Sequence, residues 1–130
     1  MATWDDLSGY IKDNYDIAGE AQQQLIQLGF RLSEERTHMV VVSLTDTGDG
    51  HPWAQIESPI GPIEAVDLRL AAELVGDALC GGLVAHHDML LIRHAVPLPE
   101  LDVHDFEAPL RVVVSTADAL ELRFTGGDDY

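Results

Sequence analysis

Apolar and polar residues alternate along three consecutive stretches of the chain, and a period of two predicts β-strands with one buried face. The stretches cover residues 24–32, 37–45 and 52–58, and polar turns separate them. Because proline cannot donate a backbone hydrogen bond to a sheet, Pro59 and Pro62 are expected to end the third strand.

A β-hairpin is predicted further along the chain. Two apolar runs, residues 82–85 and 89–96, flank the sequence His86-His87-Asp88. Short polar residues between two apolar runs favour a tight turn.

Apolar residues recur at steps of three and four in other stretches, which is the spacing of one face of an α-helix. The first stretch covers residues 4–15, where Thr3 and Asp6 resemble a capping box. The second covers residues 68–79, with Asp67 as its N-cap, and a glycine pair then stops it.

The closing helix follows Asp102, which can serve as its N-cap, and ends at Gly126-Gly127. Pro109 predicts either a kink or a short first turn that restarts at the proline. The apolar stripe of this helix consists of Phe106, Leu110, Val113, Ala117, Leu120 and Phe124.

The predicted elements follow one another in the order α-β-β-β-α-β-β-α. Adjacent strands joined by short turns indicate an α+β fold, an antiparallel sheet with helices grouped on one side. With 130 residues, the chain is expected to form a single domain over residues 1–130, with a core that needs neither disulfides nor metal.

The chain is strongly acidic, with 23 acidic residues against 7 basic ones and a net charge of −16. This charge opposes binding to nucleic acid and to anionic membranes. No apolar run approaches the length of a membrane span, and the acidic N-terminus is unlike a secretory signal, so a cytoplasmic protein is expected. The scattered acids predict a solubilising surface, with attraction to a basic partner segment as the alternative.

Residues with catalytic or metal-binding chemistry form no specific motif. His86, His87, Asp88 and His94 come closest, but adjacent histidines on a strand point apart and no metal-ligand spacing accompanies them. We therefore expect no catalytic residue, no cofactor and no metal ligand.

The remaining isolated residues of this kind are expected to be structural or exposed. Cys80 cannot form an internal disulfide, and its apolar neighbours predict a buried small side chain rather than a catalytic thiol. His38, His51 and His104 are isolated near loops or element ends and are expected at the surface.

The two faces of the predicted sheet differ in character. One face is apolar enough to bury helices and carries Ile26, Leu28, Phe30, Val40, Val42, Leu44, Ile56, Leu90, Ile92 and Val96. The other face mixes methionine and tryptophan with charged residues, which suits an adaptable contact surface. The alternative is that the second helix covers this face. The candidate partner-binding residues are Arg31, Met39, Val41, Trp53, Met89, Leu91 and Arg93.

The order of elements and several short motifs resemble the type III secretion chaperone-like fold. Within that fold the chain is similar to YbjN-type domains and to the actinobacterial peptide-binding chaperone type. The resemblance covers nearly the whole chain and is carried by the order and spacing of motifs that are weak singly. They are Trp4 and Leu7 before Tyr15, Ser58-Pro59-Ile60-Gly61, Leu91-Ile92-Arg93-His94, Val96-Pro97-Leu98, Phe106, Pro109-Leu110, Ala117-Asp118, Leu120-Glu121 and Gly126-Gly127-Asp128.

This resemblance implies a protein that is not an enzyme and that binds a polypeptide segment or works as a dimer. It brings no catalytic residues with it. We expect a protein or peptide client and a homodimer. The alternatives are a small enzyme or metal-binding protein using the region between His86 and His94, and a structural subunit of a larger assembly.

Overall fold

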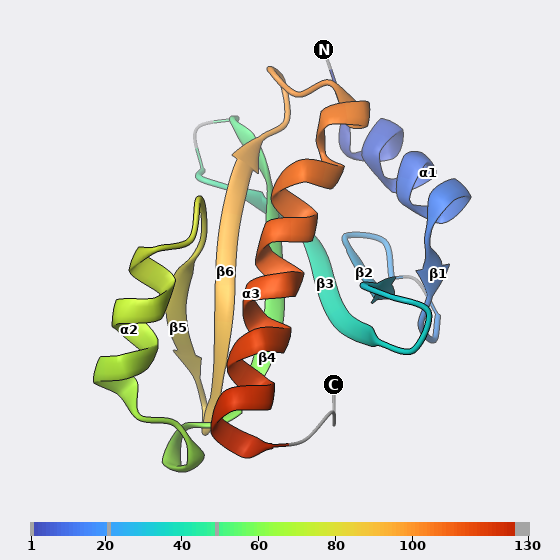
Figure 1. The fold of residues 1–130 in the computed structure, drawn as a ribbon. Coiled ribbons are helices and arrows are strands. Elements are labelled where there is room, and N and C mark those ends of the chain that lie inside the picture. Colours follow the sequence, from blue (N-terminus) through green and yellow to red (C-terminus); the bar gives the residue numbers. More distant parts are fainter. Residues whose placement is uncertain (1, 21, 49, 127–130) are drawn as a thin grey trace.

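A six-stranded antiparallel sheet forms the centre of the computed structural model, which describes residues 2–20, 22–48 and 50–126. The strands lie in the order β1-β2-β3-β4-β6-β5, and every pair of neighbouring strands is antiparallel (Figure 1). An α+β fold is thereby confirmed. The strands are β1 (Asp16–Ile17), β2 (Leu25–Arg31), β3 (Thr37–Asp46), β4 (Pro52–Pro62), β5 (Gly82–His86) and β6 (Met89–Pro97).

Three α-helices cover one side of this sheet: α1 (Trp4–Asn14), α2 (Leu68–Gly76) and α3 (Glu107–Thr125) (Figure 1). The long α3 lies over β4 and β6, while α2 lies beside it over the β5 edge. Ala71 and Val75 of α2 belong to the same core cluster as Leu120 of α3. The second helix therefore does not cover the outer face of the sheet.

The apolar face predicted from the alternating pattern is the buried one. Eight of its ten residues, all except Leu44 and Val96, are buried, and those two pack partly buried against the same cluster. The apolar stripe of α3 lies opposite, with Phe106, Leu110 and Val113 fully buried. Burial of the two apolar faces against each other is the main source of stability for this architecture.

Local sequence signals explain how the helices begin and end. Thr3 and Asp6 form the predicted capping box at α1, and Asp67 accepts a hydrogen bond from the Leu70 amide at α2. The helix α3 begins at Glu107, so Pro109 lies in its first turn, where its missing N–H leaves no helical bond unmade.

The end of α3 and the turn before it follow the same logic. Gly126 ends the helix in the left-handed conformation. Asp102 caps η2, a 3-10 turn (Val103–Asp105) that precedes α3. Gly127, the second glycine of the predicted stop, and Asp128 lie outside the described residues.

One strand was missed and two predicted boundaries were wrong. The two-residue strand β1 was missed because so short a segment has no readable period. The helix α2 ends at Gly76, earlier than predicted, and β4 continues past Pro59 to Pro62. Beyond Glu57, β4 pairs with β6 but no longer with β3, and its register against β6 shifts between Pro59 and Gly61. Prolines are tolerated in this part of the strand because fewer backbone N–H groups have to donate to a neighbouring strand.

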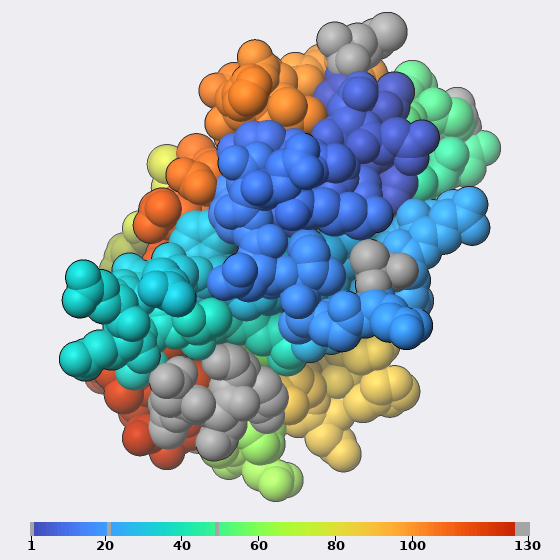
Figure 2. Space-filling model, turned by 90° about the vertical axis from the view of Figure 1, so that its right-hand side faces the viewer, coloured from blue at the N-terminus to red at the C-terminus, as the bar shows by residue number. Residues whose placement is uncertain are grey.

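Ring contacts and one hydrogen bond attach α1 to the start of α3. The Tyr15 hydroxyl donates to Glu107 Oε1 over 2.8 Å, and the rings of Tyr10 and His104 meet edge to face. Figure 2 shows the blue α1 beside the orange segment that leads into α3. Burial, followed by the bond to Glu107, raises the pKa of Tyr15. None of the described helices is both long and apolar enough to span a bilayer.

Candidate functional site

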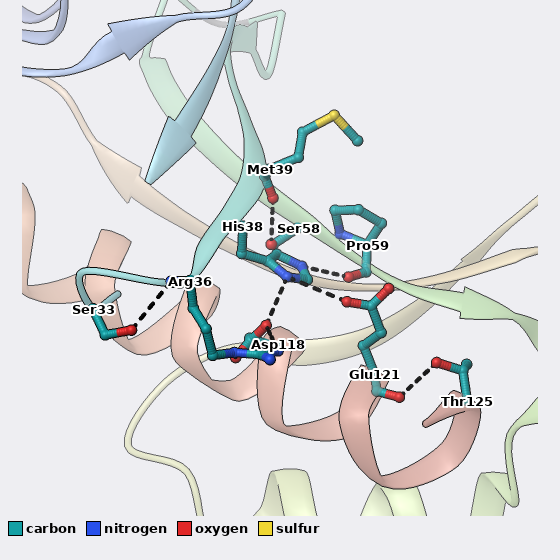
Figure 3. Close-up of polar contacts among 9 residues, drawn as sticks. All are labelled: Ser33, Arg36, His38, Met39, Ser58, Pro59, Asp118, Glu121 and Thr125. Carbon is teal, nitrogen blue, oxygen red and sulfur yellow. Dashed lines mark hydrogen bonds and ion pairs between the residues drawn. The ribbon is translucent and has the colours of Figure 1, made fainter. Parts of the chain in front are cut away.

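A buried cluster of ionisable side chains joins the sheet to α3 (Figure 3). His38 is the second residue of β3, and Asp118 and Glu121 lie on the face of α3 that covers the sheet. His38 and Glu121 are fully buried, and Asp118 is nearly so. Among the residues that the structure describes, they are the only group of three or more whose possible metal-ligand atoms all lie within 4.8 Å of one another.

Both ring nitrogens of His38 face oxygen atoms. Nε2 lies 2.8 Å from the carbonyl oxygen of Pro59, which can only accept, so this nitrogen carries a proton. Nδ1 lies 3.2 Å from Asp118 Oδ1 and 3.7 Å from Glu121 Oε1. A hydrogen bond to an ionised Asp118 requires a proton on Nδ1 as well. The His38 ring thus lies between a carbonyl group and two carboxyl groups.

Arg36 holds Asp118 in its ionised form. Its Nη2 lies 2.6 Å from Oδ1 of Asp118 and its Nε lies 3.0 Å from Oδ2, so the two side chains form a bidentate salt bridge. Burial by itself would raise the pKa of Asp118, but the hydrogen bonds and charges of Arg36 and His38 outweigh it and lower that pKa. The turn before β3 orients Arg36, whose backbone N–H donates to Ser33 Oγ.

The contacts of Asp118 decide between an ion network and a metal site here. Arg36 already holds both carboxylate oxygens of Asp118, so a divalent cation on Nδ1 of His38 would have to compete with Arg36 for Oδ1 and would bring a positive charge close to the guanidinium. The cluster is therefore better built as an ion network that ties α3 to β3 and β4.

The expectation that His38 is a surface residue was wrong, because its side chain is fully buried. Its position relative to Val40 and Val42 carries the missed signal, since all three share the parity of the apolar face. The acids at 118 and 121 also fall on the buried side of α3. A polar residue at a core-facing position of a strand, together with an acid at a core-facing position of the helix that packs on it, is the pattern that could have indicated the pairing of His38 with these acids.

The histidines between 86 and 94 do not form one cluster. His86 and His87 are exposed at the hairpin, where His87 has a left-handed φ of 55°. The expectation that these two side chains point apart was wrong, because the turn brings their rings edge to face with centroids 4.4 Å apart. His86 pairs with Met89, so His94 lies five residues further along β6, or about 16 Å. Burial raises the pKa of the half-buried Cys80 thiol, which disfavours a reactive thiolate.

The outer face of the sheet brings together most of the predicted partner-binding residues. Val41 pairs with Glu57, and Glu57 pairs with Arg93, so these three lie in one row across β3, β4 and β6. Met39 and Leu91 each lie two residues from this row along their strands, and all of these residues are half-buried. Together they form the centre of the outer face.

The other predicted residues lie at the ends of this face. Trp53 pairs with Thr45 and Pro97, four residues along β4 from Glu57, or about 13 Å. Met89 ends the face on the opposite side, beside the hairpin, and Arg31 lies exposed at the end of β2. The predicted set is therefore one central patch with Trp53 standing apart from it.

Polar groups on the outer face satisfy one another. Arg93 donates to Glu57 Oε2 through Nε and Nη2, over 3.2 and 2.9 Å, and the Gln55 amide donates to Glu57 Oε1 over 2.9 Å. The Gln27 amide donates to the sulfur of Met39. The patch thus offers apolar side chains around a preformed ion pair.

Neither the family models nor the curated proteins compared with this chain give a match. The candidate sites therefore rest on the geometry described above, and the resemblance to chaperone-like domains stays a prediction.

Proposed function

We propose that this chain is a protein- or peptide-binding module of the chaperone-like type rather than an enzyme, and that it acts as a homodimer. In this proposal the outer sheet face holds an extended segment of a client polypeptide. The observation that carries the proposal is the placement of all three helices on the opposite side. It leaves Met39, Val41 and Leu91 half-exposed with no helix over them. Exposed apolar groups gathered on one face are typical of a contact surface.

The charges of the outer face support the same proposal. The chain as a whole has a charge of −16, but this face carries Arg31 and Arg93 against Asp16 and Glu57. A client segment meets less electrostatic repulsion or desolvation here than over the acidic loops and α1. A segment with apolar residues at alternate positions fits best, because it can place them on Met39, Val41 and Leu91.

The buried ion network supports a structural rather than a catalytic role for its residues. Catalysis requires contact with a substrate, and His38 and Glu121 are both 0% exposed. Their positions tie α3 to β3 and β4, so the network keeps α3 on one side of the sheet. An open outer face follows from that arrangement.

Peptide binding provides the test. An immobilised array of short unstructured peptides is screened with labelled protein, and the best binder is measured in solution by fluorescence anisotropy. The double variant Val41→Thr/Leu91→Gln keeps size and charge but removes apolar contacts, and it is expected to weaken binding about tenfold.

A matched control uses a leucine on the helical side. Leu68 is 50% exposed on α2, so Leu68→Gln makes the same chemical change away from the outer face and should leave binding unchanged. Circular dichroism checks that all variants are folded. Absence of any binding peptide, or equal loss in the Leu68→Gln control, would contradict the proposal.

A further inference from the structure

A hollow lies at the end of the sheet where β4 begins and β6 ends, and we call it the Trp53 hollow. It has a volume of about 350 Å³ and is lined by His51, Pro52, Trp53, Pro97, Pro99 and Glu100. Trp53 shares the strand parity of Glu57, so the indole belongs to the outer face of the sheet. Ligand pockets in proteins usually have volumes of about 300–1,000 Å³, so this hollow suits one side chain rather than a long segment.

Backbone constraints fix the walls of the Trp53 hollow. The Leu98 N–H donates to the carbonyl oxygen of Pro52 over 3.0 Å, and the Leu101 N–H donates to the carbonyl oxygen of Leu98 over 3.0 Å. The second bond closes a turn whose two central residues are Pro99 and Glu100, and the buried side chain of Leu98 anchors this turn in the core. Proline also has a fixed φ, so the walls lose little conformational freedom when a ligand enters.

The polar groups of the hollow include a carboxylate and an indole N–H that other residues do not use. Within the part of the chain that the structure describes, no hydrogen bond or ion pair engages the exposed Glu100 carboxylate or the Nε1–H of the half-buried Trp53. No arginine or lysine stands among the described residues that line the hollow. The hollow therefore presents a negative charge beside an aromatic ring, without a basic side chain of this chain to occupy it.

We infer that the Trp53 hollow is a binding site for a cationic side chain of a partner polypeptide, an arginine above all. Cations are attracted to the π electrons of aromatic rings, and tryptophan is the strongest such partner among the aromatic residues. The planar guanidinium can also pair with both oxygens of the Glu100 carboxylate, for which an ammonium group is less suited. The net charge of −16 draws a basic segment toward the whole protein, and the hollow gives that attraction a specific place.

This inference rests on the proposed function for its client and deepens it by naming a residue class in the client sequence. Trp53 lies four residues along β4 from Glu57, or about 13 Å. An extended client that runs along β4 therefore places its arginine four residues from the residue that it places over the row of Val41, Glu57 and Arg93. Because this interval is even, both side chains lie on the same side of the extended segment.

Small ligands test the hollow without any client. In a Trp4→Phe background Trp53 is the only tryptophan, so its fluorescence reports on the hollow. N-acetyl-arginine amide at moderate salt should change this emission in a saturable way. N-acetyl-citrulline amide has nearly the same shape but no charge, and it should bind at least about threefold more weakly. Glu100→Gln should weaken binding of the arginine ligand by a similar factor.

A control separates the hollow from the general attraction of cations to so acidic a chain. Glu64 is exposed in η1 (Ile63–Ala65), beyond the opposite end of β4. Glu64→Gln removes the same charge there and should leave the affinity for the arginine ligand unchanged, and circular dichroism checks that both variants are folded. Equal binding of the arginine and citrulline ligands, or equal losses in Glu100→Gln and Glu64→Gln, would overturn the inference.

The client part of the experiment uses the peptide that binds best in solution. Arginine, citrulline and norleucine replace each of its residues in turn, and anisotropy measures the affinity of wild type, Glu100→Gln and Trp53→Leu for each peptide. One position should favour arginine over citrulline about three- to tenfold, and both variants should reduce that preference. Binding of norleucine as tight as that of arginine at every position would identify an apolar pocket and overturn the inference. If no peptide binds but the small arginine ligand behaves as described, the cation site is supported and only the proposed client surface is contradicted.

Discussion

His38 and Asp118, 80 residues apart in the chain, meet with Nδ1 and Oδ1 at 3.2 Å in the protein interior. The pair joins the start of β3 to the middle of α3. With Arg36 on the other side of the carboxylate, it fixes the helix over the sheet by directed bonds in addition to apolar packing. Removal of one partner therefore has consequences that a surface pair would not have.

We expect Asp118→Ala to lower the free energy of unfolding by about 3 kcal/mol, because it leaves His38 and Arg36 buried or half-buried without their shared acceptor. Urea unfolding followed by circular dichroism measures the change. Glu73→Ala is the matched control, since its partner Arg69 is on the exposed surface of α2, and it should change stability little. Equal stability of the Asp118→Ala and wild-type proteins would mean that the network contributes nothing net.

Acid should weaken the same network. The pKa of Asp118 is lower in the folded protein than its ordinary value of 3.8, so its contribution to stability is fully present above that value. The contribution is lost as the pH falls through the lower folded-state pKa. Other carboxylates also titrate there, so the difference between wild type and Asp118→Asn isolates it. That difference should shrink between about pH 5 and pH 2, and a constant difference would contradict the assignment.

Periodicity indicated the parts of the fold that depend on short-range patterns. The alternation through Ile26, Leu28 and Val40 identified the buried face, and Thr3 with Asp6 identified the start of α1. These features succeed because each is encoded within a few neighbouring residues.

Features that depend on distant partners were not predictable in the same way. The side of the sheet that α2 covers depends on its packing next to α3, and the buried His38 has its acidic partners 80 and 83 residues away, at Asp118 and Glu121. The candidate outer face could be projected from strand parity. The separation of Trp53 from Met39 could not, because it depends on the register between strands.

Two glycines should respond in opposite directions to alanine. Gly81 has φ of +100°, and a Cβ there would lie 2.9 Å from Cγ2 of Ile92, so Gly81→Ala should cost roughly 1–2 kcal/mol or more. Gly9 lies inside α1 with nothing within 4 Å of such a Cβ, and Gly9→Ala should add about 0.5–1 kcal/mol. Thermal unfolding of both variants gives the comparison, and a stabilised Gly81→Ala protein would contradict the backbone geometry.

Trp53 tests how far the client surface extends along the sheet. Its side chain is half-buried near the start of β4, where it lines a hollow of about 350 Å³ with Pro52, Pro97 and Pro99. Buried aromatic side chains often supply much of the energy of a contact, so we expect Trp53→Ala to weaken peptide binding or dimerisation while the fold persists. Light scattering, circular dichroism and anisotropy on the variant report these properties separately.

The second tryptophan of the chain provides the control for this experiment. Trp4 is also half-buried, but it packs against the core from α1, and its Nε1–H donates to the carbonyl oxygen of Gln23 over 2.9 Å. Trp4→Ala should therefore lower stability without a specific effect on peptide affinity, whereas Trp53→Ala should do the reverse. In a Trp4→Phe background, the emission of Trp53 alone should shift when the peptide binds. A Trp53→Ala protein that simply unfolds would identify Trp53 as a core residue. If instead the emission of Trp53 does not shift and Trp53→Ala leaves the peptide affinity unchanged, the client is confined to the patch around Met39, Val41 and Leu91.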